Sequence, residues 1–211
     1  LTAQNADALA IEIGRNIKAA SEITGRKTVV ISRGDSTLRG HYPNEVDALG
    51  EGLEILNAPH ILIPAFFEGG RHTVNDVHYV REDDELIPAG KTPFAKDSTF
   101  GYRSSDLKDY VQEKTNNRIK SDEVISISLD DIREGGPAKV AKILNSLQKK
   151  KVCIVNAFSQ SDLDVFTAGF YQSNKLAEPV LFRTAASIIP GLAGLPVKSP
   201  LRKEDFDLSG K

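Results

Sequence analysis

Residues 28–45 read TVVISRGDSTLRGHYPNE and join a short β-branched run to the start of a helix. The run Thr28–Ile31 is typical of a buried strand, and Pro43 suits the first turn of a helix. The loop between them carries two glycines, one carboxylate, two arginines and several hydroxyl groups. In open α/β sheets, ligands bind at the carboxyl ends of the strands. The stretch therefore predicts an α/β fold with a binding loop where its first strand ends.

Strand and helix patterns alternate along the rest of the chain. Further strands are predicted at 60–63, 124–128, 152–156 and 180–182, and helices at 3–21, 43–56, 104–116, from Pro137 to about Leu147, and 162–172. Residues 72–103 interrupt this rhythm, because Val77–Val80 and Glu85–Ile87 indicate a β-hairpin and an irregular stretch follows it. Such a long loop favours a mobile lid or rim. The predicted fold has three layers, with a mainly parallel sheet, helices on both faces and a small β-hairpin excursion.

Length and composition are those of one ordinary globular domain. The chain has 211 residues, 40% of them hydrophobic, with a formal net charge of -2, which gives no field to attract nucleic acid. We predict one domain over 1–200 and the start of a linker over 201–211, because glycine and proline become frequent from Gly191 onward. No apolar run approaches the length of a membrane span. The trio Lys149–Lys151 is expected to end a helix.

The single cysteine gives information about the cellular compartment of the protein. Cys153 lies within the apolar run VCIV, which predicts a buried strand residue and excludes an internal disulfide. A cytoplasmic location is the simplest expectation. The chain has no signal-peptide pattern, begins with Leu1 instead of methionine, and already shows a helical pattern in its first segment, so we expect a piece of a longer protein.

Two polar turns carry the candidate binding residues. In the first, Arg39 can bind a carboxylate or phosphate bidentately, and Asp35 can accept hydrogen bonds from sugar hydroxyls. The alternative is an ordinary turn in which Asp35 or Ser36 caps a helix. In the second turn, Arg71 follows Gly69 and Gly70 and is either another anion clamp or a surface arginine. A strand, a helix and a strand at this spacing imply a parallel pair, so both turns should open at one edge of the sheet.

Other chemistries are weaker interpretations of the same residues. His72 and His78 are spaced too loosely for a metal pair, so we expect His78 to make a hydrogen bond. A phosphatase with an aspartyl nucleophile would need a second aspartate two residues after Asp35, where Thr37 stands instead. The chain contains neither a phosphate loop nor a dinucleotide motif, so no nucleotide site is expected in it.

The motifs themselves resemble a known family. The run DSTLRG at 35–40 followed by Glu45, the run PAF at 64–66 and the run GGR at 69–71 resemble the amino-terminal sugar-binding domain of the four-carbon acid sugar kinases. The resemblance continues through VHYV at 77–80, FAKD at 94–97 and RTAAS at 183–187. Many members have a lysine where this chain has Ser32 and Arg33, and asparagine where it has His41. The identity of the sugar acid is therefore open.

The resemblance implies an ATP-dependent kinase that phosphorylates a hydroxyl group of a threonate- or erythronate-type acid. Residues 1–200 would then be the sugar-acid-binding domain, lacking a first strand that would precede Leu1. ATP and Mg²⁺ would be held by a second domain after Lys211, so this chain alone should be inactive and bind no cofactor or metal. The implied catalytic residue is Asp35, and the implied substrate-binding residues are Ser36, Thr37, Arg39, Gly69, Gly70, Arg71 and His78. The alternative is a non-catalytic sugar-acid binding module. The expected partners are the sugar acid and the second domain, with no nucleic acid or membrane; the oligomeric state, including a homo-oligomer, is open.

Overall fold

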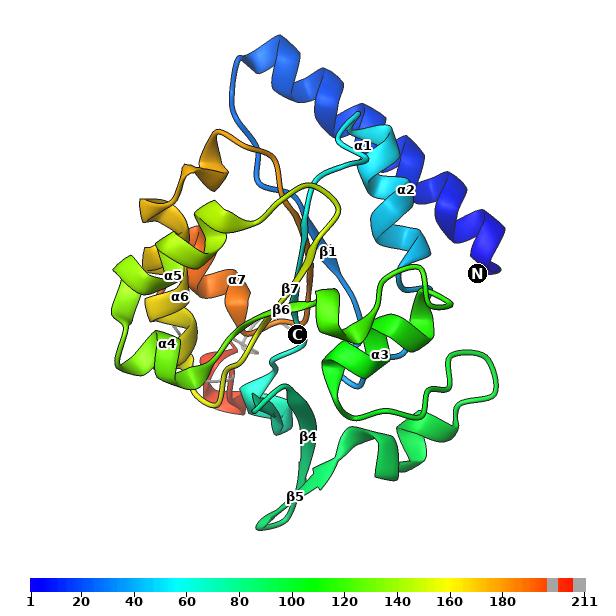
Figure 1. The fold of residues 1–211 in the computed structure, drawn as a ribbon, viewed down its shortest axis with the longest axis vertical. Coiled ribbons are helices and arrows are strands. Elements are labelled where there is room, and N and C mark those ends of the chain that lie inside the picture. Colours follow the sequence, from blue (N-terminus) through cyan, green and yellow to red (C-terminus); the bar gives the residue numbers. More distant parts are fainter. Residues whose placement is uncertain (197–200, 207–211) are drawn as a thin grey trace.

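The computed structural model describes residues 1–196 and 201–206, in which a five-stranded parallel sheet lies between two layers of helices (Figure 1). The strand order is β1-β8-β2-β7-β6. The strands are β1 Ile31–Arg33, β2 His60–Ile63, β6 Ile125–Ile127, β7 Val152–Val155 and β8 Leu181–Thr184. All neighbours in this sheet pair in parallel, so their carboxyl ends share one edge.

Helices cover both faces because the central strands are apolar on both sides. Leu62 and Ile154 pack into one core, whereas Ile61, Ile63 and Val155 pack into the other. One face is covered by α1 Ala3–Thr24, α2 Asn44–Gly52 and α3 Leu107–Lys114, and the other by α4 Leu129–Arg133, α5 Gly136–Ser146, α6 Gln160–Gln172 and α7 Ile188–Ala193. The three-layer α/β architecture predicted from the sequence is confirmed.

A second, antiparallel sheet follows β2. It contains β3 Arg71–Val74, β4 Val77–Glu82 and β5 Glu85–Pro88, in that order. The predicted hairpin is thus a three-stranded sheet, because Arg71–Val74 pairs with β4 along its whole length. Short 3-10 turns at Ala89–Lys91 and Pro93–Lys96 follow. Val80, Ala89 and Tyr102 are buried in the core that contains Leu62 and Ile154. Most of the segment predicted to be an irregular lid therefore has regular secondary structure and packs against the domain.

Several boundaries differ from the sequence prediction. The first strand begins at Ile31, not Thr28, and β8 lies between β1 and β2, which were predicted to be neighbours. Helix α3 begins at Leu107, not at residue 104, because the Asp106 carboxylate caps it by accepting hydrogen bonds from the amides of Lys108 and Asp109. The short helix α4 was not predicted.

The end of the chain is described in part. Helix α7 extends to Ala193, beyond the point where the linker composition begins, and a 3-10 turn occupies Lys203–Asp205. The rest of the predicted linker at 201–211, from residue 207 onward, lies outside the described residues. Among the described residues, no helix combines the length and the apolar character needed to cross a membrane.

Candidate functional site

The loop 34–40 leaves the sheet where β1 ends. The amide of Gly34 donates to the Thr184 carbonyl at the end of β8 (2.8 Å), which fixes the exit of the loop. Strand β2 ends at the same edge and leads into the Gly69-Gly70-Arg71 turn. The structure thus confirms that both polar turns open at one edge, although β8 separates their strands.

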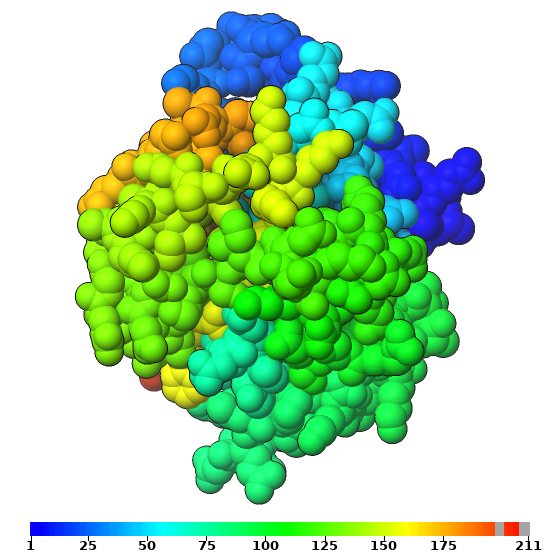
Figure 2. Space-filling model, in the orientation of Figure 1, coloured from blue at the N-terminus to red at the C-terminus, as the bar shows by residue number. Residues whose placement is uncertain are grey.

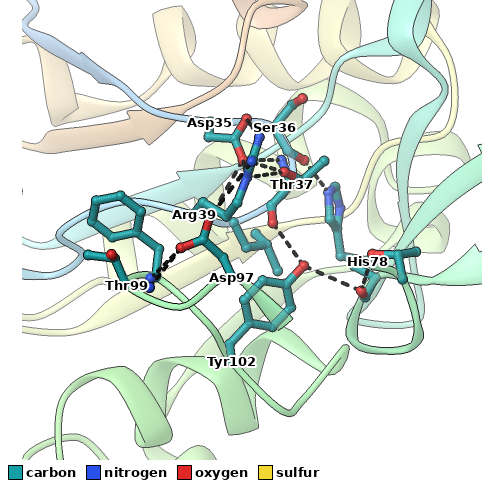
Figure 3. Close-up of polar contacts among 12 residues, drawn as sticks. Asp35, Ser36, Thr37, Arg39, His78, Asp97, Thr99 and Tyr102 are labelled. Carbon is teal, nitrogen blue, oxygen red and sulfur yellow. Dashed lines mark hydrogen bonds and ion pairs between the residues drawn. The ribbon is translucent and has the colours of Figure 1, made fainter. Parts of the chain in front are cut away.

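Asp35 is the centre of a compact polar cluster in this loop (Figure 3). Its Oδ2 atom accepts hydrogen bonds from the Thr37 amide (3.2 Å), the Thr37 hydroxyl and Arg39 Nε (2.9 Å). Burial alone would raise the pKa of Asp35, but the hydrogen bonds from Arg39 and Thr37 outweigh it and lower that pKa. Asp35 is therefore an ionised acceptor that is already satisfied by its own loop.

Three successive carbonyl groups of the loop are held by side chains of the segment that follows β3. His78 Nε2 donates to the Ser36 carbonyl (2.8 Å), Tyr102 to the Thr37 carbonyl (2.8 Å) and Tyr110 to the Leu38 carbonyl (2.9 Å). All three donors are buried. The last bond stabilises Leu38 in the left-handed region at φ 67°, which is uncommon for a residue other than glycine. The predicted rim at 72–103 and helix α3 therefore support the site loop together.

The protonation of His78 follows from these partners. A carbonyl can only accept, so Nε2 carries the proton, and Nδ1 accepts from the Thr73 hydroxyl (3.0 Å). Burial lowers the pKa of His78 to about 4. His78, predicted to bind substrate, thus lies behind the loop as a neutral residue with both nitrogens occupied.

The two predicted arginines meet at one aromatic ring. Arg39 Cζ lies 5.1 Å and Arg71 Cζ lies 5.6 Å from the centroid of Phe94. Arg71 also donates to the Gly69 carbonyl, and its buried Nε atom has no hydrogen-bond partner among the described residues. Gly70 adopts φ 75° and closes the turn that aims Arg71 at the ring. The glycines therefore shape the turn, and the arginines form its cationic surface.

A third arginine at this edge was not assigned from the sequence. Arg183 lies in β8 beside both Ser32 and Leu62, and its Nη1 atom contacts Glu45 Oε2 (2.9 Å) and Ser32 Oγ (3.1 Å). Its side chain is 9% exposed. The signal was available, because an arginine that follows Leu181 and Phe182 in an apolar strand must find a buried partner.

Two glycines of the loop make room for this arginine. A Cβ atom at Gly34 would collide with the Arg183 guanidinium, and one at Gly40 would lie 2.8 Å from Arg183 Nη2. Gly40 also adopts φ 132°. Gly34 and Gly40 thus admit the Arg183 side chain beneath the loop.

The remaining predicted residues differ in access. Thr37 is 1% exposed and faces Asp35, whereas Ser36 is partly exposed. The cavity between Asp35, Arg39 and Arg183 has a volume of only about 10 Å³, which is no more than a single water needs. This space is too small for a sugar acid. Within residues 1–196 and 201–206, no group of three metal-ligating side chains is found.

The comparison with protein families agrees with this arrangement. The family described as "Sugar-binding N-terminal domain" matches residues 1–192. The chain belongs to this family of sugar-binding domains. A search of curated proteins found no match.

Solved structures share the fold of this sugar-binding domain. A Bordetella bronchiseptica protein with a domain of unknown function, crystallised with bound citrate as a domain-swapped dimer, has a TM-score of 0.68 at 21% identity over 92% of this chain. A Haemophilus influenzae protein has a TM-score of 0.66 at 14% identity over 89% of the chain, and the putative tRNA synthase from Salmonella typhimurium LT2 has 0.62 at 17% over 82%. The chain spans only 42%, 42% and 39% of these three proteins, respectively.

Proposed function

We propose that this chain is the substrate-binding domain of an ATP-dependent kinase that phosphorylates a hydroxyl group of a small, four-carbon sugar acid. The observation that carries the proposal is the meeting of Arg39 and Arg71 over Phe94 beside Asp35, at the carboxyl edge of the sheet. Two guanidinium groups suit a carboxylate, and a carboxylate acceptor suits a hydroxyl group.

The acid group of the substrate would be held by the arginines. Arg71 forms no ion pair with any described residue and has an unsatisfied buried Nε, so a ligand oxygen would complete its hydrogen bonding. Arg39 is paired with Asp35 at 2.9 Å, so a substrate carboxylate would compete with Asp35 for it. The citrate bound by the Bordetella bronchiseptica neighbour is a polycarboxylate, which supports an acid as the ligand class.

Asp35 would orient the accepting hydroxyl group and receive its proton. While Arg39 and Thr37 hold the pKa of Asp35 down, the carboxylate is a weak base. When the substrate acid draws Arg39 away, the pKa of Asp35 rises and the carboxylate becomes a better acceptor. Binding of the acid would thus prepare the group that acts on the hydroxyl.

ATP and Mg²⁺ would be supplied by another domain of a longer protein. Phosphoryl transfer depends mainly on positioning and charge stabilisation, so a substrate half and a nucleotide half that close on each other can share the work. This chain spans less than half of its structural neighbours, which is consistent with a second domain of that kind.

Calorimetry with matched ligands tests the proposal. Threonate and erythronate should bind to the chain, whereas threitol and erythritol, which lack the carboxylate, should bind far more weakly. The chain alone should not release ADP from ATP, and the full-length protein should do so only with the acid. Binding of the acid without any such turnover in the full-length protein would favour the non-catalytic binding module. Equal binding of acids and neutral polyols would contradict the roles of both arginines.

A further inference from the structure

A hollow of about 470 Å³ lies at the opposite edge of the sheet, where β2 and β7 begin. Its charged lining consists of Arg118, Lys149, Lys150 and Lys151 with Asp47 and Glu123. Figure 2 shows the yellow segment that leads into β7 standing out from the surface beside the cyan and green segments. This hollow is separate from Asp35, which lies at the carboxyl ends of the strands.

The hollow carries more positive than negative charge. Arg118 Nη2 pairs with Asp47 Oδ2 (2.6 Å), and Lys151 Nζ pairs with Glu123 Oε1 (3.2 Å). Lys149 and Lys150 form no ion pair with any residue in the described part of the chain. Four cations therefore face two carboxylates in a chain whose formal net charge is -2.

The lysines do not serve the end of a helix, as the sequence suggested. Helix α5 ends at Ser146, so Lys149–Lys151 lie in the loop that arches from α5 to β7 (Figure 1). The loop is fixed by its backbone, because Lys150 donates to the Asn57 carbonyl (2.9 Å) and the Lys151 carbonyl accepts from His60 (2.9 Å). Lys150 adopts φ 62°, a conformation that these bonds maintain. The fold therefore holds the lysines beside the hollow.

A buried polar atom at the wall of the hollow lacks a partner. The His60 side chain is only 10% exposed, its Nε2 lies 3.6 Å from Asp47 Oδ1, and its Nδ1 has no hydrogen bond to any described residue. An unsatisfied buried nitrogen is costly in a purely structural setting. His60 lines the hollow together with the lysines, so the wall contains a buried nitrogen whose hydrogen bonding the described residues leave incomplete.

We propose that this hollow binds a small multivalent anion of the phosphate-ester or pyrophosphate class. Its volume is within the range of small-molecule sites. Lys149 and Lys150 supply compact positive charges, and Arg118, whose side chain is 56% exposed, can turn from Asp47 to a phosphate with its planar fork. This site does not depend on the proposed kinase function.

Titration of the chain with pyrophosphate, followed by amide NMR, tests this proposal. Saturable shifts should appear at residues 57–60 and 149–152. The double variant Lys149→Gln/Lys150→Gln should weaken binding by about tenfold at low salt, since it removes both unpaired charges. The matched control Lys27→Gln/Lys142→Gln makes the same change in net charge at exposed positions elsewhere and should change binding by less than about twofold.

Three results would overturn the proposal. These are the absence of saturable shifts, equal weakening in both double variants, and shifts centred on residues 34–40, which would place the anion at the sugar-acid site. Circular dichroism verifies that each variant is folded, and Lys149→Gln alone replaces the double variant if the change at Lys150 disturbs the loop. A threonate titration of Lys149→Gln/Lys150→Gln should match that of the unmodified chain whether or not the kinase proposal holds.

Discussion

Two turns bring an arginine to Phe94, but the structure holds them by different means. The loop after β1 depends on donors from elsewhere in the chain, because His78, Tyr102 and Tyr110 each bond one of its carbonyl groups. The turn after β2 is closed by its own backbone, in which Phe66 and Arg71 exchange two hydrogen bonds (2.8 and 3.1 Å). The first arginine is also paired with a carboxylate, and the second is not. The two turns of the candidate site therefore differ in the hydrogen bonds that hold them and in whether their arginine has a carboxylate partner.

The largest effect is expected where the first loop meets its support. Glutamine in place of His78 should remove a pH dependence of stability. The pKa of His78 is about 4 in the folded chain, whereas in the unfolded chain it has the ordinary value of 6.5. Between these values the unfolded chain binds more protons, so the stability conferred by neutral His78 is complete above pH 6.5 and falls as the pH decreases toward 4. The full loss is about 3 kcal/mol.

Urea unfolding at several pH values measures this loss. The free energy of unfolding of the unmodified chain should fall more steeply between pH 6.5 and 4 than that of His78→Gln. The matched variant His41→Gln, which replaces an exposed histidine whose ring contacts the Leu1 carbonyl, should keep the steep dependence. Parallel pH curves for the unmodified chain and His78→Gln would show that the loop is not held by a neutral histidine.

In the second turn, Arg71→Ala should weaken the binding of a four-carbon acid by about a hundredfold. Arg71 has no carboxylate partner to give up, so the whole charge-assisted contact is gained on binding. Arg71→Lys should restore only part of the affinity, since the ammonium group lacks the planar fork. Arg103→Ala, which removes an arginine whose side chain is 91% exposed, is the calorimetric control and should leave affinity unchanged. Equal affinities for Arg71→Ala and Arg103→Ala would exclude Arg71 from the site.

The location of the candidate site at the carboxyl edge of the sheet was predicted correctly, because local sequence patterns and the parallel direction of the strands are enough to determine it. The β-branched runs and polar turns locate Asp35 and Arg71 at strand ends without knowledge of the third strand between them. Arg183 was missed because its role depends on β8 lying between β1 and β2, a long-range pairing that no local pattern states.

The inward role of His78 was missed for a similar reason. A histidine in a strand has the same local pattern whether its ring faces a ligand or a carbonyl from a distant loop. The support of the loop by Tyr102 and Tyr110 likewise joins residues more than 60 positions apart in the sequence. Such contacts are set by tertiary packing, which overrides local signals.

In the first loop, Arg39→Ala should weaken acid binding by about tenfold, less than Arg71→Ala does. The ligand must replace Asp35 at Arg39 Nε, so the bond that is gained is offset by the bond that is lost. The double variant Asp35→Asn/Arg39→Ala completes a cycle, whose coupling energy measures this competition by calorimetry. A larger loss for Arg39→Ala than for Arg71→Ala would reverse the ranking of the two turns.

The smallest effect should have the opposite sign. Asp35→Asn removes the carboxylate that competes for Arg39, so the affinity for the acid should rise by about two- to fivefold, a modest gain because the pair is partly exposed and screened by solvent. Phosphorylation by the full-length protein should fall, since the amide cannot receive the hydroxyl proton. Asp97→Asn is the matched control, because its carboxylate lies 4.0 Å from Arg39 and mainly accepts the amides of Thr99 and Phe100. It should change affinity less than Asp35→Asn does. A loss of acid affinity in Asp35→Asn would mean that Asp35 contributes more by binding the substrate hydroxyl groups than it costs by occupying Arg39, and the proposed exchange of partners at Arg39 would then be wrong.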